Sequence, residues 1–133
     1  MSEILYIVVP CYNEQEVLPE TAARLGRKLR ELEEKEWISE RSRVLFVNDG
    51  SRDATWSLIR QYCGESKMFG GVNLSRNRGH QNALLAGITV AAEHADMIVS
   101  MDADLQDDIE ALDQMILAYR QGNDIVYGVR SSR

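Results

Sequence analysis

Two aspartates, Asp102 and Asp104, come directly after a short apolar run at residues 97–101. A run of this length and composition predicts a buried strand, so both carboxylates stand where that strand should end. In open α/β sheets, ligands bind in the crevice beyond the carboxyl ends of the strands. Hard divalent cations take oxygen ligands, often one or two carboxylates together with the phosphates of a substrate. This segment, in which Gln106 and Asp107 add further oxygen-bearing side chains, therefore predicts a divalent-metal site.

The same segment has two other interpretations, and its residues fit both of them less well. An EF-hand loop needs glycine at its sixth position and glutamate at its twelfth, where this chain has Asp107 and Asp113. A phosphatase of the haloacid-dehalogenase type also uses an Asp-x-Asp motif after a strand, with Asp102 as its nucleophile. That class normally has Thr or Val where Gln106 stands, and places the motif on its first strand. A metal-dependent phosphatase is therefore the lesser alternative.

The first two predicted strands also end in polar loops. Pro10 is expected to end the first strand, and Tyr12 and Glu14 follow it. A carboxylate in this place can accept hydrogen bonds from ribose hydroxyls or a base N–H, as acidic residues do in dinucleotide folds. Asp49 and Gly50 follow the second strand in a turn, where glycine supplies conformational freedom. The three loops should meet at one edge of the sheet.

Helix caps are expected beside these loops. Asp107 with Glu110 fits an Asp-x-x-Glu capping box, and Asn13 with Glu16 fits another. Asp53 is expected to cap the helix that follows it.

Cationic side chains are also expected at the ligand edge. Arg76, Arg78 and His80 form one small basic group, and Arg130 and Arg133 follow the last predicted strand. The guanidinium group suits phosphate because its planar fork can donate two hydrogen bonds at once. Arg130 is the strongest candidate for a phosphate contact, and His80 is a weaker one.

Strands and helices are expected to alternate along the chain. Apolar runs predict strands at 4–9, 44–48, 69–74, 97–101 and 125–129. Leucines and alanines spaced three and four apart from Leu18 to Leu32 predict an amphipathic helix, and similar patterns follow Asp53 and Asp107. A helix at about 81–92 is apolar nearly all round and is expected to be the most buried. This order implies right-handed crossovers and a mainly parallel, Rossmann-like α/β sheet covered on both faces.

Bulk composition excludes several classes of protein. The 133 residues fit one globular domain, and a net charge of −6 disfavours binding to a nucleic-acid backbone. The two cysteines lack CxxC spacing, which argues against a zinc site and suits a reducing cytosol. No apolar run approaches the roughly 18 residues that span a bilayer. No dinucleotide fingerprint or Walker loop is present, so a bound diphosphate would need a metal.

Five segments taken together resemble a known family. They are VPCYNE at 9–14, VNDGSRD at 47–53, LSRNRG at 74–79, MDADLQD at 101–107 and YGVRSSR at 127–133. The set resembles the donor-binding half of a family 2 glycosyltransferase with the GT-A fold. It is most similar to the polyprenyl-phosphate branch, which includes dolichol-phosphate mannosyltransferases and bactoprenol glucosyltransferases. The resemblance implies a three-layer nucleotide-sugar-binding fold and a hexosyltransferase activity.

The resemblance also implies roles for particular residues. It places Mg²⁺ or Mn²⁺ at Asp102, Asp104 and Gln106, bridging to the diphosphate of a UDP- or GDP-sugar, with the two aspartates as the catalytic pair. The donor would be held by a larger set, namely Pro10, Tyr12, Glu14, Asp49, Asp102, Ala103, Asp104 and Arg130. The acceptor would be a polyprenyl phosphate or a glycan, and the protein would work in the cytoplasm or at the cytoplasmic face of a membrane.

Two positions depart from the family pattern. Asn48 replaces the usual aspartate, and Asp108-Ile109 replaces a usual Pro-Pro pair. The acceptor half of the family is expected to lie beyond residue 133, so 1–133 is interpreted as one domain that is incomplete on its acceptor side. Any membrane association would then come from further segments, and the 133 residues alone are expected to be inactive. A non-catalytic nucleotide-sugar-binding module is the main alternative.

Overall fold

The computed structural model describes residues 3–104 and 109–121. Strands and helices alternate along this part of the chain, as the sequence predicts. The strands are β1 (Leu5–Cys11), β2 (Arg43–Asp49), β3 (Phe69–Leu74) and β4 (Met97–Ser100). The helices are α1 (Leu18–Glu34), α2 (Thr55–Glu65), α3 (His80–Ala92) and α4 (Ala111–Arg120). The strand predicted at 125–129 lies outside the described residues.

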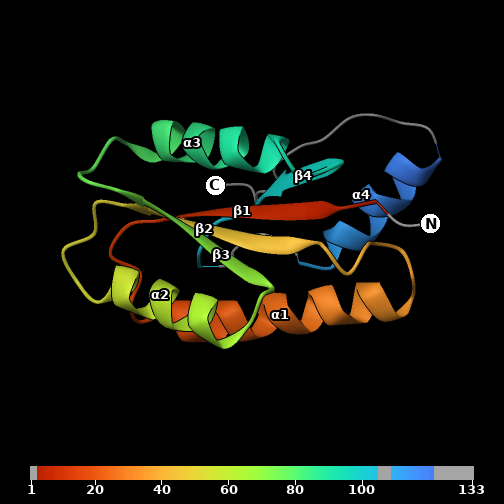
Figure 1. Cartoon of the computed structure of the whole chain (residues 1–133), viewed down its shortest axis with the longest axis horizontal. Coiled ribbons are helices and arrows are strands. Elements are labelled where there is room, and N and C mark those ends of the chain that lie inside the picture. The colour runs from red at the N-terminus through yellow and green to blue at the C-terminus, as the bar shows by residue number, and fades with distance from the viewer. Residues whose placement is uncertain (1–2, 105–108, 122–133) are drawn as a thin grey trace.

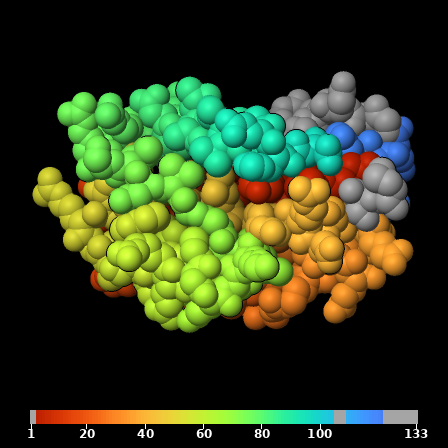
Figure 2. Space-filling view, viewed as in Figure 1, coloured from red at the N-terminus to blue at the C-terminus, as the bar shows by residue number. Residues whose placement is uncertain are grey.

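All four strands are parallel, in the order β3-β2-β1-β4. Figure 1 shows three layers, with α3 on one face of the sheet and α1 and α2 on the other. In the space-filling view, the red atoms of β1 are visible only in small patches (Figure 2). Because each strand returns through a helix, the carboxyl ends of all four strands lie at the same edge. The predicted α/β fold with a parallel sheet is confirmed.

Pro10 lies inside β1, so the prediction that it ends this strand is wrong. It stands opposite Val47 of β2, and the strand continues to Cys11. A proline in a strand needs a place where no partner requires its missing N–H. The carbonyl of Val8 accepts the N–H of Met101 on the β4 side, and Pro10 faces the same way two residues later. Pairing between β1 and β4 has ended there, at Val8 and Ser100, so the proline is tolerated.

α1 is the most buried helix, which corrects the prediction for 81–92. Its leucines at 18, 25, 29 and 32 have no exposed surface, whereas Leu85 of α3 is 60% exposed. α3 contacts the sheet through a row of small residues, Ala83, Gly87 and Ala91. A Cβ at Gly87 would lie 2.5 Å from Cγ1 of Val8. Small side chains bring α3 close to the sheet and leave its larger ones outside, so apolar content alone did not predict burial.

The capping box predicted for Asn13 and Glu16 does not form. α1 begins at Leu18, and the side chain of Asn13 bonds the backbone of Arg52 instead. A distant partner thus takes the side chain that the local pattern had assigned to a cap. The other predicted box pairs Asp107 with Glu110, and Asp107 lies outside the described residues. α4 begins at Ala111, and Glu110 accepts a hydrogen bond from Lys28.

The part of the chain at 3–104 and 109–121 contains no helix that is long and apolar enough to cross a membrane.

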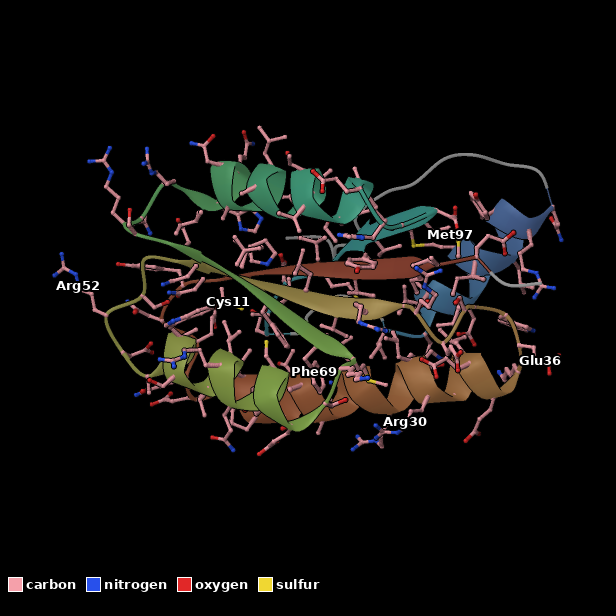
Figure 3. All side chains as sticks on the ribbon, viewed as in Figure 1. Cys11, Arg30, Glu36, Arg52, Phe69 and Met97 are labelled. Atoms are coloured by element: carbon pink, nitrogen blue, oxygen red, sulfur yellow. The ribbon has the colours of Figure 1, made fainter. Side chains whose placement is uncertain are left out.

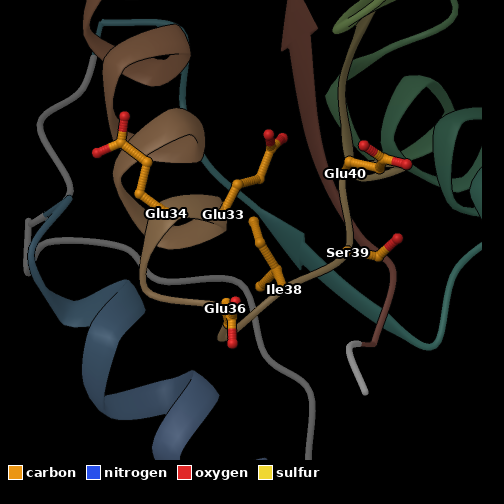
Figure 4. A pocket seen from close by; sticks show the side chains of 6 residues that line it. All are labelled: Glu33, Glu34, Glu36, Ile38, Ser39 and Glu40. Atoms are coloured by element: carbon orange, nitrogen blue, oxygen red, sulfur yellow. The ribbon is translucent and has the colours of Figure 1, made fainter.

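α1 ends in a Schellman motif with a glutamate where glycine is usual. The N–H of Trp37 bonds the carbonyl of Leu32, and the N–H of Glu36 bonds that of Glu33. Glu36 has a φ of 62°, a left-handed conformation that is costly for a residue with a Cβ. It lines an acidic hollow with Glu33, Glu34, Ile38, Ser39 and Glu40 (Figure 4). This hollow precedes β2 and therefore lies at the edge of the sheet away from the loops at the strand ends.

Glu36→Gly is expected to raise the free energy of unfolding by about 0.5–1 kcal/mol. Glycine relieves the cost of the left-handed conformation, and its greater freedom in the unfolded chain offsets part of that gain. Urea denaturation measures the change, and Glu36→Gln is the matched control because it removes the charge and keeps the Cβ. An equal gain from both variants would assign the effect to charge repulsion in the hollow and contradict the backbone explanation.

Candidate functional site

A hollow of about 220 Å³ opens where β1, β2 and β3 end. Four of the predicted donor-binding residues line it: Pro10, Tyr12, Glu14 and Asp49. Its other lining residues are Cys11, Asn77, Gly79 and His80. In Figure 3, Arg52 from the loop after β2 extends from this end of the molecule, and Met97 at the start of β4 lies toward the other. Residues far apart in the sequence therefore meet around one opening.

The loop after β1 is tied to the loop after β2 by backbone-to-side-chain hydrogen bonds. Asn13 has a φ of 53°, its N–H donates to Oγ of Ser51 at 2.9 Å, and its Oδ1 accepts the N–H of Arg52 at 2.8 Å. The N–H of Glu14 donates to Oγ1 of Thr55 at 2.8 Å. These bonds fix the backbone at Asn13 and Glu14. The loop after β1 therefore holds the carboxylate of Glu14 at the rim of the hollow.

Asp53 lies at the start of α2 and stabilises both of these loops. Its Oδ1 accepts the N–H of Thr55 at 2.9 Å, and its Oδ2 accepts the N–H of Gln15 at 3.3 Å. Burial acts in the opposite direction, but the hydrogen bonds from Thr55 and Gln15 lower the pKa of Asp53. Ala54, and not Asp53, occupies the N-cap of α2, but the carboxylate of Asp53 still accepts an N–H of the first turn, that of Thr55.

Asp49 joins the loop after β2 to the loop after β3. Its side chain is 3% exposed, and its Oδ1 accepts the N–H of Arg78 at 2.7 Å. Gly50, with a φ of 69°, brings the two backbones together, because a Cβ there would lie 2.2 Å from the nitrogen of Asn77. Asp49 therefore both lines the hollow and fixes the backbone next to Asn77 and Gly79.

Asn48 uses both ends of its amide, which gives a physical reason for its presence. It is 3% exposed, its Nδ2 donates to Oδ1 of Asn73 at 2.8 Å, and its Oδ1 accepts the N–H of Ser51 at 3.2 Å. An ionised aspartate could accept from Ser51 but could not donate to Asn73. Asn48 thus ties the loop after β2 to the end of β3 and does not line the hollow.

Cys11 is a packing residue. It is 1% exposed, and its Sγ donates to the carbonyl of Val9 at 3.4 Å. Burial, reinforced by the charge of Glu14, raises the pKa of the Cys11 thiol far above neutral pH. The thiolate is the nucleophilic form of cysteine, so this side chain is inert in the folded protein.

The Asp102–Asp104 segment lies on the β4 side of the sheet edge at which the hollow opens. β4 pairs with β1, and the segment follows directly after it. Burial first, and then the charges of Asp104, Asp53 and Asp102, raise the pKa of Glu14. The two aspartates are thus near enough to act on a carboxylate that lines the hollow. Gln106 and Arg130, which were predicted to join this site, lie outside the described residues.

The residues present fit a divalent cation that is partly held by its substrate. Asp102 is half-buried, Ala103 is 3% exposed and Asp104 is exposed. Within 3–104 and 109–121, no three His, Cys, Asp or Glu side chains are arranged as a complete metal-binding group. Mg²⁺ and Mn²⁺ sites of the substrate-bridged type need only one or two carboxylates, with phosphate oxygens and water as the other ligands. The fit is therefore to a metal that binds together with a phosphorylated ligand.

Sequence reasoning did not select Asn77 and Gly79, and it ranked His80 low. All three line the hollow, in or next to the loop between β3 and α3. The rule that placed Glu14 and Asp49 at strand ends applies equally to this loop. The end of β3 at Leu74 is the signal that would have placed these neutral residues at the same edge of the sheet.

A family model described as "Glycosyl transferase family 2" matches residues 6–133. An uncharacterized glycosyltransferase of Bacillus subtilis, YkoT, is 48% identical over 98% of this chain and 39% of its own length. A prophage bactoprenol glucosyl transferase homolog of Escherichia coli is 36% identical over 96% of this chain and 39% of its own length. An undecaprenyl-phosphate 4-deoxy-4-formamido-L-arabinose transferase of Aeromonas hydrophila is 33% identical over 98% of this chain and 38% of its own length. The chain thus spans about two fifths of these relatives.

Solved structures resemble this chain in fold. TarS residues 1–349 from S. aureus superposes with a TM-score of 0.66 at 17% identity, covering 89% of this chain and 32% of that one. The mannosyltransferase PcManGT from Pyrobaculum calidifontis, solved in complex with GDP-Man and Mn²⁺, gives 0.61 at 22% identity, covering 90% and 32%. At these identities the likeness concerns the fold alone, and it confirms the predicted GT-A architecture.

Proposed function

Because the chain belongs to glycosyltransferase family 2, we propose that the hollow at the strand ends binds the donor of a sugar-transfer reaction. The donor is a nucleoside-diphosphate sugar with UDP or GDP as its leaving group. One observation carries the proposal: Pro10, Tyr12, Glu14 and Asp49, from loops far apart in the sequence, line a single opening beside the aspartate pair. The opening suits the nucleoside, and the aspartate pair suits the diphosphate.

The nucleoside occupies the hollow. Tyr12 is 43% exposed and offers a ring on which a base can stack, while Glu14 and Asp49 provide oxygens that accept from ribose hydroxyls or a base N–H. Asn77 and His80, which also line the hollow, add further polar groups. Uracil and guanine differ in the donors and acceptors at their edges, so the choice of base depends on these side chains.

The diphosphate lies beside Asp102 and Asp104, which hold Mg²⁺ or Mn²⁺ together with Gln106, and Ala103 lines the donor between them. When bound, the cation supplies Lewis-acid stabilisation of the charge that develops on the leaving diphosphate. Asp102 and Asp104 orient the diphosphate, and Arg130 donates to its oxygens.

The acceptor is a polyprenyl phosphate, a proposal supported by the names of the bactoprenol and undecaprenyl-phosphate relatives. A phosphate oxygen of the acceptor attacks the anomeric carbon, a new carbon–oxygen bond forms, and the bond from that carbon to the diphosphate breaks. The acceptor phosphate is largely ionised at neutral pH, since its second pKa lies at about 6 by analogy with phosphorylated side chains. Side chains of the protein therefore need not remove a proton from it.

Titration calorimetry with UDP and GDP, in Mn²⁺ and in EDTA, tests the donor site. Mn²⁺ is expected to tighten binding of one nucleotide, and Asp104→Ala is expected to weaken the Mn²⁺-dependent binding by about 10–100-fold. Glu34→Ala is the matched control, because it removes the same charge from the acidic hollow at the other edge of the sheet.

Two results would contradict the proposal. Nucleotide binding that needs no metal and survives Asp104→Ala would exclude the metal bridge and favour a simple binding module. Release of phosphate from a simple phosphate ester, dependent on Asp102, would favour the phosphatase instead.

A further inference from the structure

A threonine on α1 holds the backbone between the two aspartates. The hydroxyl of Thr21 donates to the carbonyl of Ala103, which belongs to the peptide group that joins Ala103 to Asp104. Thr21 is 2% exposed and Ala103 is 3% exposed, so water does not compete for this bond. A buried carbonyl left without a donor costs about 1–3 kcal/mol, which makes the contact a firm constraint on the segment.

The direction of this hydrogen bond is unusual for a threonine inside a helix. Such a side chain commonly bonds a carbonyl one turn earlier in its own helix. In α1 the carbonyl of Val17 accepts the backbone N–H of Thr21, and the hydroxyl reaches instead to a residue 82 positions away. The side chain therefore links two elements rather than capping its own.

The same helix also holds the start of α4. Lys28 follows Thr21 by two helical turns, about 10 Å along the axis. Its Nζ lies 3.0 Å from Oε1 of Glu110 and 2.8 Å from Oδ1 of Asp113, and its side chain is only 4% exposed. Burial alone would lower the pKa of Lys28, but its hydrogen bonds to Asp113 and Glu110 raise it, so Lys28 keeps its charge.

α1 is a rigid support for both contacts. Its leucines have no exposed surface and belong to the main core together with β1 and β2. Pro19 in its first turn restricts the backbone close to Thr21. Because the core holds α1 in place, the contact from Thr21 holds the peptide between Ala103 and Asp104 in a fixed position relative to the core.

We propose that Thr21 is a positioning residue for the metal-binding pair Asp102 and Asp104. By fixing the intervening peptide, its hydroxyl sets the separation of the two carboxylates before a cation arrives. Partners that orient metal ligands typically change metal affinity by about 10–100-fold when they are removed. This inference rests on the proposed donor site, because it assigns Thr21 a role only if Asp102 and Asp104 hold a cation.

Thr21→Val tests the inference, because valine has nearly the shape of threonine and lacks the hydroxyl. Mn²⁺ is titrated into the purified chain saturated with the nucleotide that binds more tightly, and nucleotide affinity is measured separately in EDTA. Thr21→Val is expected to weaken Mn²⁺ binding by about 10–100-fold and to leave nucleotide affinity in EDTA unchanged. Thr21→Ser keeps a hydroxyl and is expected to restore Mn²⁺ affinity to near that of the native chain.

Several outcomes would overturn the inference. Equal Mn²⁺ affinity of Thr21→Val and the native chain would do so while leaving the donor site intact, whereas a native chain without Mn²⁺-dependent nucleotide binding would refute the donor site itself. Thr21 would be a packing residue if Thr21→Val lost as much nucleotide affinity in EDTA as Mn²⁺ affinity. The same conclusion would follow if Thr21→Ser failed to recover Mn²⁺ binding. Thermal unfolding checks that each variant is folded, and Thr21→Ala replaces Thr21→Val if the valine does not fit.

Discussion

Gly50→Ala is expected to lower the free energy of unfolding by about 2–5 kcal/mol and to weaken nucleotide binding. The φ of 69° at Gly50 costs about 1–2 kcal/mol for a residue with a Cβ. The added carbon would also lie 2.2 Å from the nitrogen of Asn77 and 2.4 Å from the carbonyl carbon of Arg76. These are backbone atoms, so a rotamer change cannot relieve the contact, and overpacking adds about 1–3 kcal/mol.

Two glycines provide controls for this prediction. Gly64 lies in α2 with open space around its Cα, so Gly64→Ala should be neutral or slightly stabilising. Gly79 has a φ of 95°, and a Cβ there would meet no atom within 4 Å, so Gly79→Ala should show a conformational cost without a clash. Urea denaturation of the three variants separates the two contributions. A Gly50→Ala variant as stable as the native chain would show that the loops after β2 and β3 are not in contact.

Gly87→Val is expected to cost at least about 3 kcal/mol, the upper end of the range for overpacking. The first added carbon alone would lie 2.5 Å from Cγ1 of Val8 and 2.8 Å from Cγ2 of Val47. Both valines are buried, and their branched side chains are stiff at χ1, so α3 must move away from the sheet.

Two further variants test whether close packing against Val8 causes this loss of stability. Gly64→Val, in α2, controls for helix propensity and should cost less than about 1 kcal/mol. Val8→Ala removes the nearest obstacle, and in the Gly87→Val background it should recover part of the lost stability, a coupling of about 1 kcal/mol or more. Purely additive effects of Val8→Ala and Gly87→Val would contradict the close packing of α3 on β1.

The arrangement of the elements was predictable because their patterns are local. The run at 69–74 predicted β3 with the bounds that the structure has, and the spacing of leucines from Leu18 to Leu32 predicted α1. Burial of α3 was mispredicted, because the close approach of Gly87 to Val8 depends on a partner 79 positions away that no window of sequence contains (87 minus 8).

In the candidate site, too, some features could be predicted from the sequence and others could not. Position at a strand end placed Glu14 and Asp49 correctly at the hollow, since the edge of a parallel sheet follows from topology alone. Partners of individual side chains did not follow from pattern: Asn13 bonds the loop after β2, and Thr21 reaches Ala103. Each of these bonds joins distant segments and competes with a plausible local alternative, so only the folded structure decides between them.

The strand order β3-β2-β1-β4 also dictates when the protein can assemble as it is synthesised. β2 leaves the ribosome soon after β1 and can pair with it on one side, and β3 can then pair with β2. The other side of β1 waits for β4. Until then the nascent chain carries a bare edge of apolar strand, which is a template for pairing with other chains. The aspartate segment emerges directly after β4. A newly made chain therefore closes this edge of β1 just before the aspartate segment is added.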